Sequence, residues 1–458
     1  MIMNNNWYKK EKPLPTMIGM GGGATSLIAS SGGLPVYYWY NTLEGASNIE
    51  RWYGVYISQD VDGISEYVYA AGDTRSEGQG GPYEALIAGY DKEGAIQWQR
   101  TFGSAGVETF AGGVMVDVNG NVYTGGYQTA NFYALFVKYN SSGTLQFQKE
   151  YYFSIGGSDY GGLGAASLNG NKGDLSNIQL YHTGYVTSTK GAYLVKFSSS
   201  GLVQWARLLT GEGGGNAEGN GLGSDSSDNI IMALHGVTSG QHHLTVAKWN
   251  SSGTIQWKRK LVTSSNGQGS GVACDSNDNV YVLGTNHSDT TAIIAKWNSS
   301  GTLQWQRKID GVNGYGGISI DDSDNIYIAG KVSSGSKIYW AKYNTSGTIQ
   351  LQRTWDSSGS EDIRDMRVDD QGGVVAVIIS GWTSTGNDPG LLLKLPGDGS
   401  GTGTYGSYTY AVSTLTESAN TGTESEFTGT DSALTVNIQN TSFTSATSTL
   451  TSTTATIS

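Results

Sequence analysis

The chain has 458 residues, of which 68 are glycine, 28 tyrosine, 12 tryptophan and only 6 proline, a turn-rich, aromatic composition typical of all-β proteins. Its formal net charge of −12 argues against nucleic-acid binding, because phosphate contacts need a basic surface. The single cysteine, Cys274, excludes an intrachain disulfide, and the lack of an apolar run of about eighteen residues argues against membrane insertion.

Residues 1–46 differ from the rest of the chain and predict a flexible leader. An aromatic pair and a lysine cluster are followed by glycines that interrupt the apolar segment. A secretory signal needs an unbroken apolar segment, so we expect no signal peptide. Such a leader is typical of a docking peptide that orders against a partner. The expected docking residues are Trp7, Tyr8, Lys9, Lys10 and Lys12.

A repeated phrase runs through residues 47–396. Its clearest copy is residues 250–259 (NSSGTIQWKR), and its turn glycine recurs about fifty residues apart. The turn glycines are Gly94, Gly143, Gly201, Gly253, Gly301 and Gly347, with a degenerate copy near Gly397. A period of this length is typical of the blades of a β-propeller.

Each copy contains four short runs of alternating apolar and polar residues, the pattern of β-strands. In the fifth copy these runs are residues 271–275, 279–284, 292–298 and 302–309. Asn, Asp and Gly between the runs predict tight hairpin turns. A four-stranded meander buries little by itself, so the copies are expected to close into a ring.

The last copy lacks a fourth strand of its own. Its three runs are residues 363–369, 373–380 and 390–395, whereas residues 47–53, ahead of the first inner strands, resemble an unpaired fourth strand. We therefore predict an all-β fold, a propeller of seven four-stranded blades over residues 47–396, closed by this N-terminal strand.

Residues 397–458 begin as a glycine-rich linker and continue as a Ser/Thr-rich tail. Residues 405–414, 433–438 and 448–457 alternate at period two and indicate strands with few apolar side chains. Such strands form no core alone, so they would pair with the propeller, with a second copy of the chain in an oligomer, or with another protein. A disordered tail is the alternative.

Binding is expected in the longest loops, at residues 74–83, 154–164, 169–174 and 210–221. Tyrosine offers a rigid amphipathic surface and asparagine offers adaptable hydrogen bonds, although core packing explains each single tyrosine more simply. The candidate binding residues are Tyr83, Tyr152, Tyr160, Asn216 and Asn220.

No motif predicts catalysis, a cofactor or a bound metal. The pair His242 and His243 is expected in a surface loop, and the Asp-rich turns, as at 275–279, lack the glycine and terminal glutamate of a calcium loop. The acidic stretch 361–370 is interrupted by arginines and is expected to be a solvated face. We therefore expect a protein that is not an enzyme.

Two resemblances add to this interpretation. The repeat, seen again at residues 138–147 (KYNSSGTLQF), resembles that of bacterial seven-bladed propeller repeat proteins and the tryptophan docking motif of pyrroloquinoline-quinone-type propellers, over roughly residues 52–395. In both families the outer-strand aromatic packs on the adjoining blade. Residues 7–13 (WYKKEKP) with glycines 21–23 are similar to the leaders of structural proteins of marine and cyanobacterial tailed phages.

The resemblances imply a non-enzymatic virion surface protein, either a capsid or head-fibre decoration or a tail-associated adhesin. Its leader would attach to other virion proteins, and its propeller would bind a host or environmental surface, with a glycan as the expected ligand. It would be made in the host cytoplasm and reach the virion surface. A bacterial surface or secreted binding propeller is the alternative, and a polysaccharide-acting enzyme comes third.

Overall fold

The structure is a computed structural model. The predicted docking residues at 7–12 and most of the predicted leader lie outside its described residues. Those described residues are 39–44, 50–59, 66–75, 82–103, 106–117, 119–155, 158–160, 162–163, 168–169, 180–186, 191–238, 240–262, 266–286, 290–333, 337–356, 361–369, 375–381, 390–405, 408–419, 423–426, 430–440, 444–447 and 451–456.

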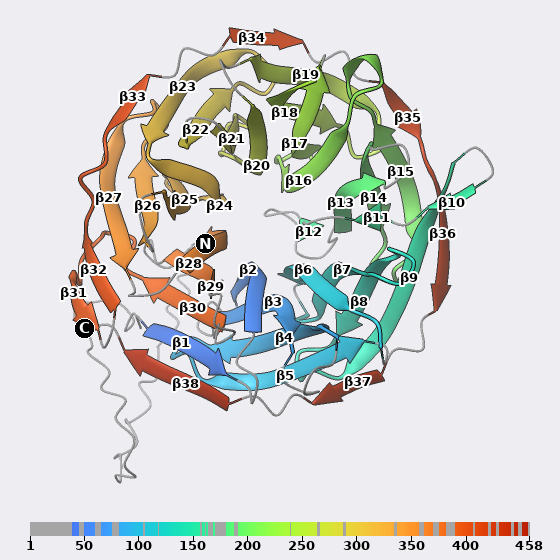
Figure 1. The fold of residues 1–458 in the computed structure, drawn as a ribbon, viewed down its shortest axis with the longest axis horizontal. Coiled ribbons are helices and arrows are strands. Elements are labelled where there is room, and N and C mark those ends of the chain that lie inside the picture. The colour runs from blue at the N-terminus through green and yellow to red at the C-terminus, as the bar shows by residue number, and fades with distance from the viewer. Residues whose placement is uncertain are drawn as a thin grey trace, which may run out of the picture.

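Antiparallel sheets stand around a central axis and form a β-propeller (Figure 1). Within the described part of the chain there are seven sheets, each with four propeller strands ordered from the axis to the rim. The predicted all-β propeller with four-stranded blades is confirmed. In the fifth repeat, for example, the four predicted runs coincide with four consecutive strands to within a few residues.

Six sheets each take their propeller strands from one continuous stretch of chain. The first three are β2 (Glu50–Gln59), β3 (Glu66–Thr74), β4 (Glu84–Asp91) and β5 (Ile96–Gly103); β6 (Thr109–Val116), β7 (Val122–Gln128), β8 (Ala134–Tyr139) and β9 (Leu145–Ile155), with β10 (Ser158–Tyr160) beside β9; and β11 (Gly162–Leu163), β12 (Leu168–Asn169), β13 (Leu180–Val186), β14 (Ala192–Phe197) and β15 (Val203–Leu209).

The next three sheets follow the same order. They are β16 (Ala217–Ser224), β17 (Ile230–Thr238), β18 (Gln241–Trp249) and β19 (Ile255–Val262); β20 (Gly267–Cys274), β21 (Val280–Asn286), β22 (Thr291–Trp297) and β23 (Leu303–Asp310); and β24 (Val312–Ile320), β25 (Ile326–Val332), β26 (Lys337–Tyr343) and β27 (Ile349–Asp356). A short 3-10 helix, η1 (Glu212–Gly214), precedes β16.

The last sheet joins the two ends of the chain. It consists of β28 (Glu361–Val368), β29 (Val375–Gly381) and β30 (Gly390–Leu395), with β1 (Trp39–Glu44) as the fourth strand. Closure by an N-terminal strand is confirmed, but the prediction of residues 47–53 is wrong, since residues 50–53 form the start of β2, the innermost strand of the first sheet. The predicted leader boundary at residue 46 is therefore also too late.

The position of Trp52 explains this error. Its side chain is fully buried in a cluster with Val55, Val68 and Leu392, at the seam between the first and last sheets. An aromatic residue at that place therefore looks like the rim tryptophan of other repeats although it lies near the axis. The true equivalent is Trp39, which belongs to the same buried cluster.

At five of the junctions between blades in the described residues, a tryptophan packs on a turn glycine of the next blade, as the docking resemblance implied. Trp257 donates from Nε1 to the carbonyl oxygen of Ser299 in the following turn, at 3.1 Å. Its ring packs so closely on Gly301, which has a φ of +81°, that a Cβ there would lie 2.8 Å from the indole. The same contact joins Trp98 to Gly143, Trp205 to Gly253, Trp305 to Gly347 and Trp39 to Gly94.

The last turn glycine is misplaced in the sequence prediction by two residues. Gly399, and not Gly397, adopts the left-handed conformation, with a φ of +71°, and its amide closes a turn on the carbonyl of Pro396. Arg353 donates to the Gly399 carbonyl at 2.8 Å, as Arg259 does to Gly301. This turn therefore takes part in the same contacts between blades as the others.

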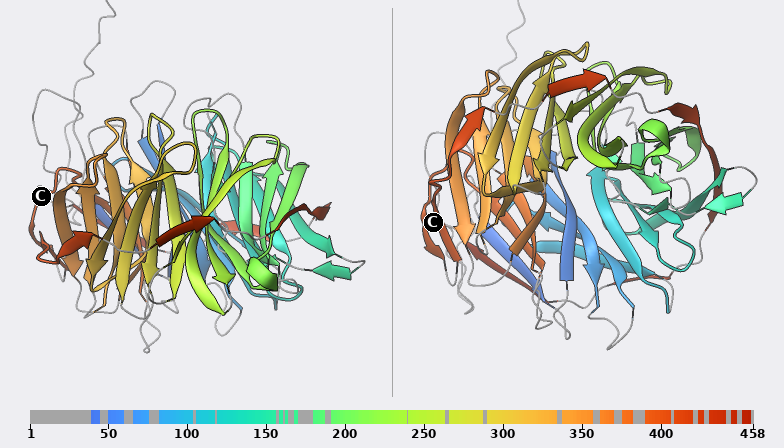
Figure 2. Two further views of the ribbon diagram at one scale, coloured as in Figure 1. Left: turned by 90° about the horizontal axis from the view of Figure 1, so that it is seen from above. Right: turned by 45° about the horizontal axis from the view of Figure 1, so that its top comes forward.

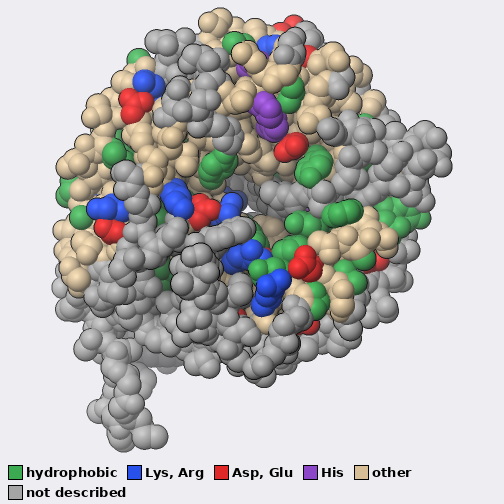
Figure 3. Space-filling model, viewed as in Figure 1, with side chains coloured by type: hydrophobic (Ala, Val, Ile, Leu, Met, Phe, Trp, Pro, Cys, Tyr) green, Lys and Arg blue, Asp and Glu red, His purple; other side chains and the backbone are tan. Residues whose placement is uncertain are grey.

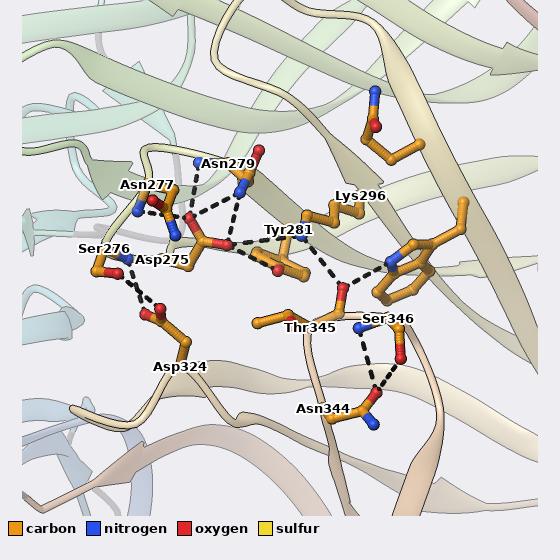
Figure 4. A network of polar contacts seen from close by, with 12 residues as sticks. Asp275, Ser276, Asn277, Asn279, Tyr281, Lys296, Asp324, Asn344, Thr345 and Ser346 are labelled. Carbon is orange, nitrogen blue, oxygen red and sulfur yellow. Dashed lines mark hydrogen bonds and ion pairs between the residues drawn. The ribbon is translucent and has the colours of Figure 1, made fainter.

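The Asp-rich turns act as turn formers, as predicted (Figure 4). Oδ1 of Asp275 accepts hydrogen bonds from the amides of Asn277 and Asn279, at 3.0 and 2.9 Å. Its Oδ2 accepts from the hydroxyl of Tyr281 at 2.9 Å. Lys296, 3.7 Å from the same carboxylate, donates to a carbonyl of the next blade, so the turn also helps to hold neighbouring blades together.

The C-terminal segment, residues 403–456, encircles the ring, and we call it the belt (Figures 1 and 2). Its strands pair with β27, β23, β19, β15, β9, β5 and β1, in the reverse of chain order. Of the arrangements that the sequence left open, the structure shows pairing with the propeller. The belt strands are β31 (Gly403–Tyr405), β32 (Tyr408–Val412), β33 (Glu417–Ala419), β34 (Thr423–Glu426), β35 (Asp431–Ala433), β36 (Thr435–Asn440), β37 (Thr444–Thr447) and β38 (Thr451–Thr456).

Candidate binding site

The innermost strands of six sheets share an irregularity that shapes the axis. In each strand the pairing register shifts, so that an extra residue lies opposite the neighbouring strand. Such β-bulges redirect side chains and are frequent beside functional sites. The extra residues Tyr53, Gly112, Asn220, Ser270, Gly317 and Arg364 all line one cavity on the axis.

The cavity widens into a pocket of about 570 Å³. Figure 3 shows basic side chains gathered beside the central hollow, with apolar side chains near them. The narrower part, about 100 Å³, is bordered by residues of the innermost strands, among them Gly112, Gly221 and Gly271. We call the wider part the axial pocket, and its lining includes Arg51, Tyr53, Tyr127, Tyr185, Asn220 and Arg364.

Two arginines form the basic side of the axial pocket. Arg51 on β2 pairs with the buried Asp73 at 2.9 Å, and its guanidinium lies 4.1 Å from the centre of the Tyr83 ring. Arg364 on β28 pairs with Asp362 at 2.7 Å. Because a carboxylate holds each guanidinium, both positive groups have fixed places in the pocket wall.

Tyr53 lies in the electric field of both arginines. Burial and the Asp73 carboxylate raise the pKa of its hydroxyl well above the usual range, while Arg51 and Arg364 act in the opposite direction. The hydroxyl therefore stays protonated at neutral pH and donates a hydrogen bond to the Asp73 carboxylate.

Another part of the pocket wall is aromatic and uncharged. Phe110 and Tyr127 stack with ring centres 5.0 Å apart, and Tyr185 lines the same wall. Asn220 donates to the carbonyl oxygen of Gly269 at 2.8 Å, which fixes its amide. A few polar groups set in an aromatic wall are typical of sites for small organic ligands.

The acidic stretch 361–370 is not the solvated face that the sequence predicts. It forms β28, an innermost strand, so alternate residues turn toward the axis or toward a neighbouring blade. Burial raises the pKa of Asp365, although Arg367 and the amides of Val55 and Met366 stabilise its charged form. The interrupting arginines are thus partners of buried carboxylates.

Asp73 gives stability a pH dependence that can be measured. Burial raises the pKa of its carboxyl to about 6 from 3.8, against the effect of Arg51 and Tyr53, and Glu108 adds to the rise. Between pH 3.8 and about pH 6 the carboxyl of Asp73 binds more protons in the folded protein than in the unfolded chain. Its contribution to the free energy of unfolding therefore falls as the pH rises through 6. We expect Asp73→Asn to raise the melting temperature at about pH 7 more than at about pH 4.5, each pKa unit corresponding to about 1.4 kcal/mol. A larger gain at the lower pH would contradict this.

Of the five predicted binding residues, Asn220 alone lines the axial pocket. Tyr83 lies behind the wall, between the guanidiniums of Arg51 and Arg75, each 4.1 Å from its ring centre. It therefore supports Arg51 from outside the cavity.

The other predicted residues lie elsewhere. Tyr152 is at the rim, where its ring stacks on Tyr133 at 4.9 Å and its backbone pairs with the belt at Asn437. The backbone of Tyr160 lies in β10, beside β9. The carbonyl of Asn216 accepts a hydrogen bond from the amide of Val237 at 2.9 Å, a structural role.

The sequence held a signal for the pocket that the prediction missed. Gly219-Asn220-Gly221 and Gly269-Ser270-Gly271 occupy the same place in successive repeats. A small residue on each side of a variable one marks the bulge. The variable residue in each of these repeats therefore contributes to the axis. Tyr53, between Trp52 and Gly54, and Arg364, between Ile363 and Asp365, lack this pair of small neighbours, so the rule does not identify them.

The histidine pair is also misplaced by the sequence prediction. His242 and His243 lie in β18, not in a loop, and His243 is buried. His242 stacks on His235 with ring centres 4.2 Å apart. Across the residues that the structure describes, no group of three or more His, Cys, Asp or Glu side chains could hold a metal, and no helix there could span a membrane.

Comparisons with known proteins describe the architecture alone. No family model matches the chain, and no curated protein does. Among solved structures, a protein of unknown function from Dyadobacter fermentans is 7% identical, with 78% of this chain and 98% of that chain covered and a TM-score of 0.41.

Two further solved structures are equally distant. The NanB sialidase from Streptococcus pneumoniae is 12% identical, with 82% of this chain and 71% of that chain covered and a TM-score of 0.40. Drosophila Plexin A in complex with Semaphorin 1b is 8% identical, with 81% and 88% covered and a TM-score of 0.41. Similarities this weak say nothing of what the protein binds.

Proposed function

We propose that this protein is a non-enzymatic binding propeller that holds a glycan in the axial pocket. The observation that carries the proposal is the set of bulges that brings Tyr53, Asn220, Ser270 and Arg364 from separate strands to one cavity. Strand interiors hold these residues more rigidly than loops would, which lowers the entropy lost on binding.

The composition of the pocket supports a sugar as the ligand. Tyr127 and Tyr185 offer flat apolar surfaces with hydroxyl tips, and Asn220, Gln268 and Ser270 offer amide and hydroxyl groups. A sugar ring has apolar C–H faces and a rim of hydroxyls, so both parts of the wall find partners.

The state of the nearby carboxylates supports binding without cleavage. Asp365 accepts hydrogen bonds from the amides of Val55 and Met366 and from Arg367, at 3.1, 2.8 and 3.0 Å. Glycoside hydrolysis needs one carboxylic acid and one carboxylate directed at the substrate. One observation favours the alternative of a polysaccharide-acting enzyme, namely the pKa of about 6 for Asp73 behind the pocket.

The place where the propeller acts is the second part of the proposal. We infer that it is displayed on a phage virion, as a capsid or head-fibre decoration or a tail-associated adhesin. Support comes from the leader resemblance at residues 7–13. A bacterial surface or secreted binding propeller is the alternative. A variant without residues 1–38, which keeps β1, is expected to fold and to be absent from purified virions, and its presence there would contradict virion docking through the leader.

A glycan array with matched tyrosine variants tests the binding site. Tyr185→Ala removes part of the pocket wall and is expected to weaken binding of the array's best glycan about tenfold or more. Tyr152→Ala removes a rim tyrosine and is expected to leave the affinity unchanged, as measured by calorimetry. Equal losses in both variants would move the site away from the axis. Released sugars or new reducing ends from the bound glycan would establish the enzyme instead.

A further inference from the structure

We infer that the sugar residue in the axial pocket carries a carboxylate, which Arg51 and Arg364 bind together. The inference rests on the proposed function and narrows its ligand class to glycans that contain uronic acids. Three features of the pocket carry it: both guanidiniums line one cavity, a buried donor of Arg364 has no partner among the described residues, and aromatic residues line the same wall.

The two arginines come from adjacent blades that are tied together at the pocket. Arg51 lies on β2 and Arg364 on β28, and both line the axial pocket. The amide of Val55 on β2 donates to Oδ2 of Asp365 on β28 at 3.1 Å. This bond fixes the two strands, so the guanidiniums keep a constant spacing. Planar guanidiniums match the planar oxygens of a carboxylate.

A buried donor of Arg364 has no hydrogen-bond partner in the part of the chain that the structure describes. Arg364 uses Nη2 for its ion pair with Asp362, whereas its Nε is buried and has no hydrogen-bond partner among the described residues. Leaving a buried donor unsatisfied is unfavourable by about 1–3 kcal/mol. A carboxylate bound in the axial pocket, which Arg364 lines, would give this guanidinium a second partner beside Asp362.

The charge distribution of the protein favours a ligand with one acidic group over a polyanion. The chain has a net charge of −12, so a molecule with many negative groups is repelled as it approaches. The basic groups of the pocket are local, and the same wall also holds the aromatic residues Phe110, Tyr127 and Tyr185. One acidic group on an otherwise uncharged ring meets both kinds of group, as in a uronic acid residue.

Pairs of oligosaccharides that differ in one functional group test this inference. Trimers that carry one galacturonate, glucuronate or mannuronate residue and are otherwise neutral are compared with galactose, glucose and mannose trimers of the same linkage, by calorimetry at neutral pH. We expect the best uronate trimer to bind at least about tenfold more tightly than its neutral partner, with a preference that falls as salt rises.

Matched variants of the full-length protein assign the preference to the arginines. Arg364→Gln is combined with Asp362→Asn so that the variant loses one positive and one negative charge. We expect the preference for the uronate trimer over the neutral trimer to fall to about twofold or less, while the neutral trimer still binds. Lys308→Gln removes a charge from an outer-strand ion pair with Asp310 and is expected to change nothing. A preference that survives in the double variant would overturn the role of Arg364.

The outcomes separate this inference from the proposed function. Equal affinity for a uronate trimer and its neutral partner, or tighter binding of the neutral one, would overturn the carboxylate and leave a glycan-binding propeller. Failure of every trimer and of every glycan on the array would overturn both.

Discussion

Replacement of Trp39 by alanine is expected to lower the free energy of unfolding by about 3–5 kcal/mol, the range for a buried aromatic residue. The Trp39 side chain is almost completely buried and stacks on Tyr90 with ring centres 6.1 Å apart. Its Nε1 donates to the carbonyl of Lys92 at 2.9 Å, and its ring covers Gly94 in the first blade. The change thus removes a buried ring, a hydrogen bond and the contact that Trp39 makes between the last sheet and the first blade.

The closing seam has a special place in the ring. In each of the other sheets the third and fourth propeller strands follow one another along the chain, whereas in the last sheet β30 and β1 come from opposite ends of the chain and are held together by their pairing. A loss of packing at β1 therefore opens the ring, while a similar loss elsewhere leaves the blades joined.

Trp305→Ala is the matched control for this prediction. Trp305 makes the same contacts with the next blade, donating to Thr345 at 3.1 Å and covering Gly347, but it is only partly buried. We expect a loss of about 1–2 kcal/mol there. Chemical denaturation of both variants gives the comparison. An equal loss at the two sites would show that the closing seam is no more important than an internal one.

The blades could be predicted from the sequence because their signals are local. Gly301 and its equivalents need a left-handed backbone in a tight turn, and Trp257 follows a fixed number of residues after its own turn glycine. Each repeat therefore carries both halves of the contact between blades, and the period makes them visible together.

The closing strand could not be found in this way because its repeat is divided between the two ends of the chain. In the other blades the turn leads directly into the fourth strand. In the last blade the turn at Gly399 leads into the belt, and the fourth strand is Trp39–Glu44. Trp39 therefore lacks the preceding turn phrase that identifies its equivalents.

The axial pocket was hidden for a different reason. Arg51 and Arg364 are far apart in the sequence and become neighbours only when the first and last blades meet. The bulge that turns Tyr53 and Arg364 inward is a property of strand pairing, so alternation of apolar residues within one strand does not reveal it. The prediction looked for binding residues in loops and therefore selected Tyr152, which lies at the rim, and Asn216, which takes part in a turn.

Deletion of the belt, residues 403–458, is expected to lower the melting temperature by roughly 10 °C or more and to make the ring aggregate. The fourth strand of every blade then becomes an exposed sheet edge. Tyr410, fully buried against Trp355 with ring centres 6.2 Å apart, is lost as well, and this alone removes about 3 kcal/mol.

Two further variants separate edge covering from ion pairing. Glu417→Gln with Glu424→Gln removes the ion pairs to Arg307 and Arg259, at 3.2 and 3.3 Å, but keeps the belt, and exposed pairs of this kind contribute less than about 1 kcal/mol each. Deletion of residues 444–458 uncovers only β5 and β1 and is expected to fall between the two. Because β1 closes the ring and is itself paired by β38, the short deletion should account for a disproportionate share of the loss.

A melting temperature unchanged by the full deletion would mean that the blades protect their own edges, and the belt would then serve something other than the stability of the ring.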